Sequence, residues 1–136
     1  MFCFVGGFSM GGAMAMTLAY KYHHDVAGVF ALSSFLNHNS SAYQTLKQTT
    51  DKEKLPPLFQ CHGERDELSS IEWAKETHKN LTDLGVKGEF HSFNMFHEFN
   101  KRELTMWRQW VLKLLPGKDI MILVFRFNKY DCANCS

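Results

Sequence analysis

The chain has 136 residues and a mass of 15.7 kDa, which is the size of one ordinary domain and too small for two. Apolar residues make up 45% of the sequence and charged residues 21%, so the chain can bury a hydrophobic core and is not of a disordered or low-complexity type. Fifteen basic and 14 acidic side chains are spread along the chain and give a net charge of +1, which argues against nucleic-acid binding.

The sequence also bears on the compartment in which the protein works. No basic segment followed by a long apolar run stands near Met1, so no secretory signal is predicted. The longest apolar run, Ile120 to Phe125, is far shorter than the roughly 20 residues that a membrane-spanning helix needs. Four scattered cysteines are too few for a disulfide framework, which favours a reducing compartment. We therefore expect a cytoplasmic protein with no transmembrane segment.

Strand and helix patterns alternate along the chain. Apolar runs predict four buried strands, at residues 2–5, 26–32, 58–61 and 86–93. Helical patterns follow them, and these helices are expected to begin at Met10, near Tyr43, at Ser69 and at Asn100. The last two begin with capping boxes, formed by Ser69 with Glu72 and by Asn100 with Glu103. This order predicts an α/β fold with a mostly parallel sheet and flanking helices.

The end of the chain has a different character. Pro116-Gly117 ends the last predicted helix, residues 120–127 resemble an extra strand, and residues 128–136 are polar. We expect one α/β domain over residues 1–117 and an extension over residues 118–136. Cys132 and Cys135 form a C-x-x-C pair, which is half of a zinc site, but no second pair accompanies it. An unstructured tail with two thiols and no metal is therefore the favoured interpretation.

The run Gly7-Phe8-Ser9-Met10-Gly11 matches the G-x-S-x-G pattern. In this motif a serine lies on a sharp turn between a strand and a helix, and glycines stand beside it because side chains there would clash. The predicted strand before it and the predicted helix after it supply that context. Ser9 would lie at the positive end of the helix dipole, where the backbone N–H of Met10 can donate to an oxyanion. The alternative is a Gly/Ser turn that only caps a helix.

A nucleophilic serine needs a base and an acid. In folds of this kind the acid and then the histidine follow the serine along the chain, each just after a strand. Asp66 lies in the turn after the third predicted strand, and His97 lies in the loop after the fourth. Taken singly, each is better explained as a solvated loop residue. Their order favours Ser9, Asp66 and His97 as a catalytic set.

Six other histidines compete for the role of base. Two end the first helix, one lies in a polar loop, one lies on the apolar face of a helix, one is inside a strand and one precedes the acid: His23, His24, His38, His78, His91 and His62. For His78 a hydrogen-bonded core histidine is the favoured interpretation. Only His97 occupies the loop that the order requires.

Four runs carry a family resemblance: Gly6 to Gly12, Ala31 to Leu36, Gln60 to Gly63 and His91 to Phe93. Over roughly residues 4–117 the chain resembles the acyl-protein thioesterase/lysophospholipase (carboxylesterase) family of α/β-hydrolases. The resemblance implies an α/β-hydrolase fold and a cytosolic serine hydrolase that needs no cofactor. The implied substrates are S-acylated proteins or small acyl esters. Ser9 matches the family nucleophile, Asp66 the acid and His97 the base.

The chain also departs from the family. Family members carry about as much sequence again before the nucleophile strand, so we expect the N-terminal half of the domain to be absent here, as in a truncated or alternatively spliced product. That half includes the loop with the second oxyanion donor, whose loss typically lowers kcat by about 10²–10³-fold. Residues 2–5 would then form an apolar edge strand that favours self-association. A non-catalytic fragment that acts in binding or regulation is therefore the alternative function, and the acyl-chain length stays open.

Overall fold

The computed structural model describes residues 2–115, 117 and 119–126. Strands and helices alternate within these residues, in the order β1 (Phe2–Phe8), α1 (Met10–Thr17), a π-helical turn (Leu18–Tyr22), β2 (Gly28–Leu32), α2 (Ser41–Gln48), a 3₁₀ turn (Lys52–Lys54), β3 (Leu58–Gly63), α3 (Ile71–Asp83), β4 (Gly88–Phe93), α4 (Lys101–Leu114) and β5 (Ile120–Phe125). The predicted α/β class is confirmed.

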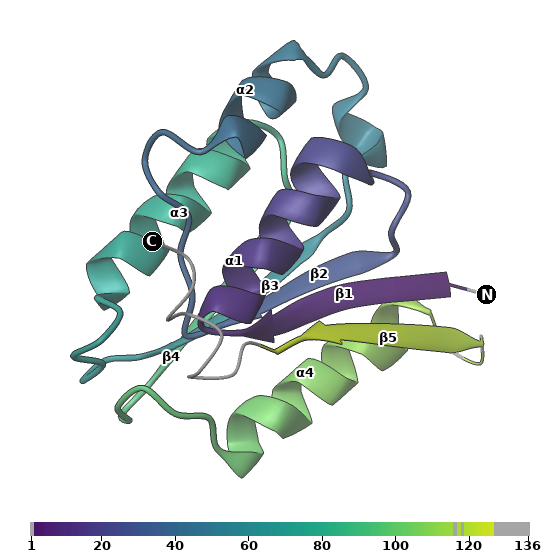
Figure 1. Ribbon diagram of the computed structural model, residues 1–136. Helices are drawn as coiled ribbons and strands as arrows, with labels where there is room; N and C mark the ends of the chain where they lie inside the picture. The colour runs from purple at the N-terminus through teal and green to yellow at the C-terminus, as the bar shows by residue number, and fades with distance from the viewer. Residues whose placement is uncertain (1, 116, 118, 127–136) are drawn as a thin grey trace.

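The strands form one sheet in the order β4-β3-β2-β1-β5, and each neighbouring pair is parallel. Figure 1 shows α1, α2 and α3 on one face of this sheet and α4 on the other. Because the strands are parallel, their carboxyl ends share one edge, and the loops that follow β1, β3 and β4 leave from that edge. The topology therefore brings together segments that lie far apart in the sequence.

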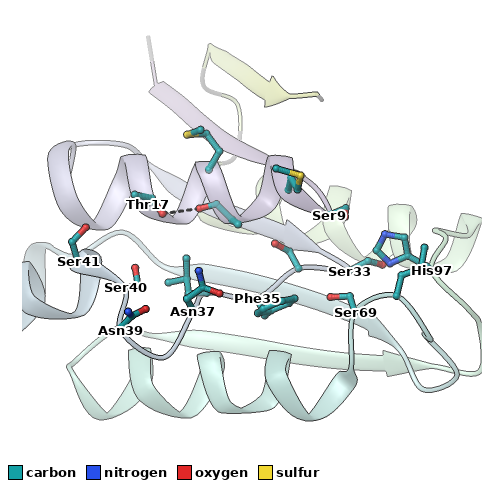
Figure 2. Close-up of a pocket in the computed structure, with 16 residues that line it drawn as sticks. Ser9, Thr17, Ser33, Phe35, Asn37, Asn39, Ser40, Ser41, Ser69 and His97 are labelled. Atoms are coloured by element: carbon teal, nitrogen blue, oxygen red, sulfur yellow. Dashed lines mark hydrogen bonds between the residues drawn. The ribbon is translucent and has the colours of Figure 1, made fainter. Parts of the chain in front are cut away.

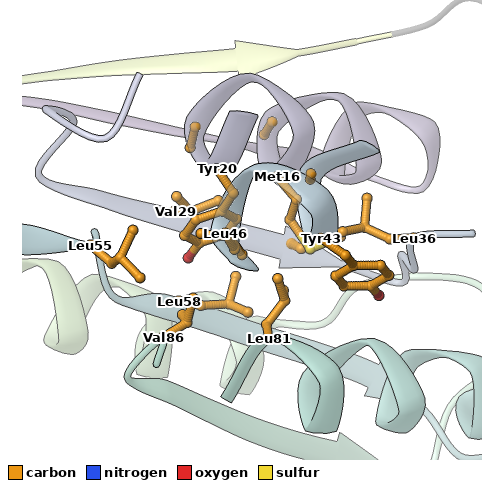
Figure 3. Packing of buried hydrophobic residues seen from close by; sticks show 14 of the residues in the cluster. Met16, Tyr20, Val29, Leu36, Tyr43, Leu46, Leu55, Leu58, Leu81 and Val86 are labelled. Carbon is orange, nitrogen blue, oxygen red and sulfur yellow. The ribbon is translucent and has the colours of Figure 1, made fainter. Parts of the chain in front are cut away.

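Successive residues of the central strands contribute to two different hydrophobic clusters. In β2, Val29 and Ala31 pack into the cluster beneath α1, α2 and α3, whereas Phe30 and Leu32 pack into the cluster beneath α4. Figure 3 shows the first cluster, where side chains from these helices and from β2 and β3 converge. Burial on both faces is the reason that these strands are continuously apolar in the sequence.

The prediction that the first strand forms an edge of the sheet is wrong. β5 pairs with β1 in parallel, from Phe2 opposite Ile120 to Gly7 opposite Phe125. α4 carries the chain from β4, at one edge of the sheet, to β5 at the other. β5 is now the edge, and its side chains are 41–50% exposed at Met121, Ile122, Leu123 and Val124. The exposed apolar edge of the sheet is therefore the last strand, β5, and not the first strand, β1.

The predicted start of α3 is also wrong by one residue. The N-cap is Ser70, whose side chain accepts a hydrogen bond from the Glu72 N–H at 3.2 Å. Ser69 is buried, and its N–H donates to Asp66 Oδ1 at 2.8 Å. Ser69 therefore belongs to the turn before the helix and is not its cap.

Glu103 stands at the start of α4 as a fully buried carboxyl group. The predicted capping box is confirmed, because Asn100 Oδ1 accepts from the Glu103 N–H and Glu103 Oε2 accepts from the Asn100 N–H. Glu103 Oε1 has no hydrogen-bond partner among the described residues. Burial raises the pKa of Glu103 to about 7, and the Asn100 N–H opposes this only in part.

A raised carboxyl pKa makes folding stability depend on pH. Between pH 4.5 and pH 7 the folded chain holds a proton that the unfolded chain has released, so the contribution of Glu103 to stability falls as the pH rises. The whole loss of folding stability over this pH range corresponds to about 3 kcal/mol. Glu103→Gln keeps an acceptor for Asn100 without the buried charge. We expect the stability of the variant, relative to that of the native chain, to be greater at pH 8 than at pH 5, as measured by urea unfolding at both pH values. An equal difference at both pH values would contradict this.

Candidate active site

Ser9 alone forms the turn between β1 and α1. The predicted strand of residues 2–5 extends to Phe8, so Gly6 and Gly7 lie within β1 and do not end it. α1 begins at Met10, as predicted. Ser9 has φ 56° and ψ −122°, a strained conformation for a residue other than glycine. Its N–H donates to the carbonyl of Leu32 at 2.8 Å, and its side chain makes no capping hydrogen bond to α1. The Ser9 hydroxyl is therefore not used to start the helix.

The two glycines of the motif are required by close backbone packing. A Cβ on Gly7 would lie 2.5 Å from the carbonyl carbon of Gly11. A Cβ on Gly11 would collide with the carbonyl oxygen of Phe125. Strand, helix and β5 thus meet at a point where only hydrogen atoms fit, which is the steric reason for the pattern.

Asp66 lies in the turn after β3 with its side chain fully buried. Asp66 Oδ1 accepts hydrogen bonds from the N–H groups of Leu68 at 2.9 Å and Ser69 at 2.8 Å. Asp66 Oδ2 lies 2.7 Å from His97 Nδ1. Two backbone donors therefore fix one carboxylate oxygen and leave the other to the histidine.

His97 lies in the loop between β4 and α4, and its side chain is 16% exposed. Because a carboxylate can only accept, the hydrogen bond to Asp66 puts a proton on Nδ1, and Nε2 is left to act on a substrate or nucleophile. The Phe8 ring packs against the imidazole, with 4.8 Å between ring centroids. These contacts from two sides hold the ring in a defined orientation.

Ser9 and His97 line the same cavity, which has a volume of about 760 Å³. Figure 2 shows both residues at one end of it, together with Ser33, while Asn37 and Asn39 lie toward the other end. No hydrogen bond joins Ser9 and His97 among the described residues, and such contacts are often long in unliganded sites. The other described lining residues are serine, threonine, asparagine and apolar side chains, without a carboxylate, lysine or arginine.

The remaining histidines lie elsewhere or act differently. His78 Nδ1 lies 3.2 Å from Gln60 Oε1, and burial lowers the pKa of His78, so it is hydrogen-bonded as predicted but only partly buried. His62 is fully buried and lies beside Asp66, a contact that the sequence analysis did not identify. The position of Phe8 against His97 was missed as well. Its only signal was its place in the G-x-S-x-G motif.

In the part of the chain that the structure describes, no group of three or more His, Cys, Asp or Glu side chains could hold a metal ion. Cys132 and Cys135 lie outside the described residues. No described helix combines the length and the apolar character needed to cross a membrane.

Comparison with known proteins links the chain to one family. The family model described as Phospholipase/Carboxylesterase matches residues 3–115. Lysophospholipase-like protein 1 of Mus musculus is 55% identical over 115 residues, which cover 84% of this chain and 47% of that protein. Acyl-protein thioesterase 1 homolog 2 of Dictyostelium discoideum is 30% identical over 114 residues, which cover 82% of this chain and 50% of that protein.

A solved structure agrees on the fold. Acyl-protein thioesterase 2 of Zea mays matches with a TM-score of 0.73 and 23% identity, over 85% of this chain and 57% of that one. The expected α/β-hydrolase architecture, a parallel sheet with flanking helices, is thereby confirmed. The chain spans about half the length of the curated relatives it matches.

Proposed function

The chain belongs to the phospholipase/carboxylesterase family, and we propose on this basis that it is a serine hydrolase of acyl thioesters or esters. In this proposal Ser9 is the nucleophile, His97 is the base and Asp66 holds the imidazole in the required tautomer. The observation that carries the proposal is the 2.7 Å contact between the buried Asp66 carboxylate and His97, at the end of the cavity that Ser9 also lines.

The chemistry follows from these positions. Ser9 Oγ attacks the acyl carbonyl carbon while His97 Nε2 takes the hydroxyl proton, and the carbonyl π electrons move onto oxygen. The backbone N–H of Met10, at the N-terminus of α1, donates to that oxyanion. Collapse of the intermediate expels the thiolate or alkoxide, which takes the proton from His97. Water then hydrolyses the acyl-serine by the same steps, and Ser9 is regenerated.

The substrate class is proposed from the relatives and from the cavity. The family description names phospholipases and carboxylesterases, and the two relatives are named as lysophospholipase-like and as an acyl-protein thioesterase homolog. The cavity has neutral polar and apolar walls, which suit an uncharged acyl ester or thioester. We therefore propose small acyl esters or S-acylated proteins as substrates. On cysteine usage alone we place this reaction in the cytosol.

We propose that the activity of the 136-residue chain is weak. The chain spans about half of the two curated relatives named above, and in α/β-hydrolases the loop that supplies the second oxyanion donor precedes the nucleophile strand. One missing donor lowers kcat by about 10²–10³-fold.

A fluorophosphonate probe tests the proposed nucleophile directly. We expect the folded chain to be labelled and Ser9→Ala to lose the label completely. Ser33→Ala is the matched control, because Ser33 lines the same cavity and also has a positive φ, of 54°. It should keep the label. Labelling that survives Ser9→Ala, or a folded chain that takes no label, would contradict the proposal.

The alternative is a polypeptide that binds instead of catalysing. The observation that favours it is β5, an uncharged edge strand whose central side chains are 41–50% exposed. Such an edge offers unpaired backbone groups to another strand. A folded chain that self-associates and takes no fluorophosphonate label would favour this alternative.

A further inference from the structure

His62 lies next to the acid, although the proposed mechanism does not use it. It is near the end of β3, and its side chain is fully buried. His62 Nε2 lies 2.5 Å from the carbonyl oxygen of Ser69 and 3.4 Å from Asp66 Oδ2. Both neighbouring atoms accept hydrogen bonds, so this geometry assigns the His62 proton to Nε2.

The turn from Asp66 to Ser69 is held by this imidazole. Both backbone polar groups of Ser69 are hydrogen-bonded: its N–H donates to Asp66 Oδ1, and its carbonyl accepts from His62. The residue is 5% exposed, so without His62 its carbonyl would be a buried acceptor that has lost its partner. His62 therefore ties the turn to β3 at the point where Asp66 Oδ2 faces the base.

The loop that carries the base is attached to the first residues after β3 in a different way. The Glu64 N–H donates to the carbonyl of Phe93 at 2.8 Å, and the Arg65 N–H donates to the carbonyl of Met95 at 3.1 Å. These are backbone hydrogen bonds that a change of the His62 side chain leaves in place. Loss of the His62 imidazole should therefore change the position of Asp66 and leave the loop that carries His97 in place.

We propose that His62 is a positioning residue of the hydrolytic site. Through its hydrogen bond to the Ser69 carbonyl it holds the turn whose Leu68 and Ser69 N–H groups fix Asp66 Oδ1, and so keeps Oδ2 in line with His97. Its effect on turnover rests on the proposed function. The orientation of Asp66 can be measured in the unliganded protein whether or not the chain is a hydrolase.

The test follows the hydrogen bond between His97 and Asp66 by nuclear magnetic resonance. A proton held between Nδ1 and a buried carboxylate exchanges slowly with water, so its resonance reports the bond. His62→Leu removes the N–H donor and fills the buried position with an apolar side chain. We expect this resonance to be lost in the folded variant. We also expect kcat for an acyl thioester to fall at least tenfold with KM unchanged, because binding does not need the acid.

A matched control and a rescue separate positioning from stability. His78→Leu removes a partly buried histidine of α3, which contacts Gln60 and not Asp66, and should keep the resonance. His62→Gln can place an amide N–H near the position of Nε2 and should restore the bond, whereas the shorter His62→Asn should not. If His62→Leu does not fold, the glutamine and asparagine variants decide the question.

The outcomes also separate this proposal from the proposed function. An unchanged His97 resonance in folded His62→Leu, or equal behaviour of the glutamine and asparagine variants, would overturn the role of His62. Fluorophosphonate labelling that persists in Ser9→Ala would overturn the hydrolase instead, and the resonance would still decide the role of His62.

Discussion

Ser9→Ala and His97→Ala are each expected to reduce hydrolysis of a short-chain acyl thioester to the background rate. The nucleophile and its base act as a unit, so removing either one costs nearly as much as removing both. Asp66→Asn should lower kcat by up to about 10⁴-fold, because an amide facing His97 Nδ1 favours the wrong tautomer of the imidazole. Release of the free thiol measures all three variants.

Glu67→Gln is the control for the acid. Glu67 is an exposed carboxylate in the same turn as Asp66, and its loss should leave turnover unchanged. Equal losses in Glu67→Gln and Asp66→Asn would show that the turn needs negative charge in general. Turnover by the native chain equal to that of a complete family member would contradict the expected loss of an oxyanion donor.

Removal of residues 118–136 is expected to destroy the cooperative unfolding transition and to leave an aggregating chain. β5 covers β1 along its length, from Phe2 opposite Ile120 to Gly7 opposite Phe125. Six half-buried apolar side chains contribute on the order of 5 kcal/mol, which is comparable to the whole stability of a small domain. Sedimentation and urea unfolding measure the effect.

Removal of residues 127–136 alone is the matched control, because it keeps β5. This shorter deletion should leave the unfolding transition and the association state unchanged. If the two deletions behave alike, β5 does not stabilise the sheet.

The elements of the fold could be predicted largely because buried strands have a strong local signal. The apolar runs around Phe4, Phe30 and Phe59 are flanked by turn residues, and helical periodicity follows each run. Strand order is different, because it depends on contacts between distant segments. The pairing of β5 with β1 has no signature in either segment, so an edge was predicted where the structure has a central strand.

The candidate site shows the same division between local and distant information. The motif around Ser9, and the turns that carry Asp66 and His97, were identified from residue type and chain order. Ser69 was predicted as the helix cap because Glu72 follows it three residues later, whereas the structure uses Ser70. Ser69 is held instead by Asp66 and by its contact with His62. That contact joins β3 to a buried turn, which no sequence spacing specifies.

In the proposed reaction Ser9 carries the acyl group, and the position of that group can be located directly. The chain is mixed briefly with an acyl thioester, quenched in acid and digested, and the peptides are weighed by mass spectrometry. We expect one acyl group on the peptide that contains Ser9, and none on that peptide in Ser9→Ala. Cys3 is a partly exposed free thiol that can exchange with a thioester, whereas the Cys61 thiol is buried and burial raises its pKa. An acyl group on Cys3 or Cys61 alone, or no acyl group at all on the folded chain, would contradict the account.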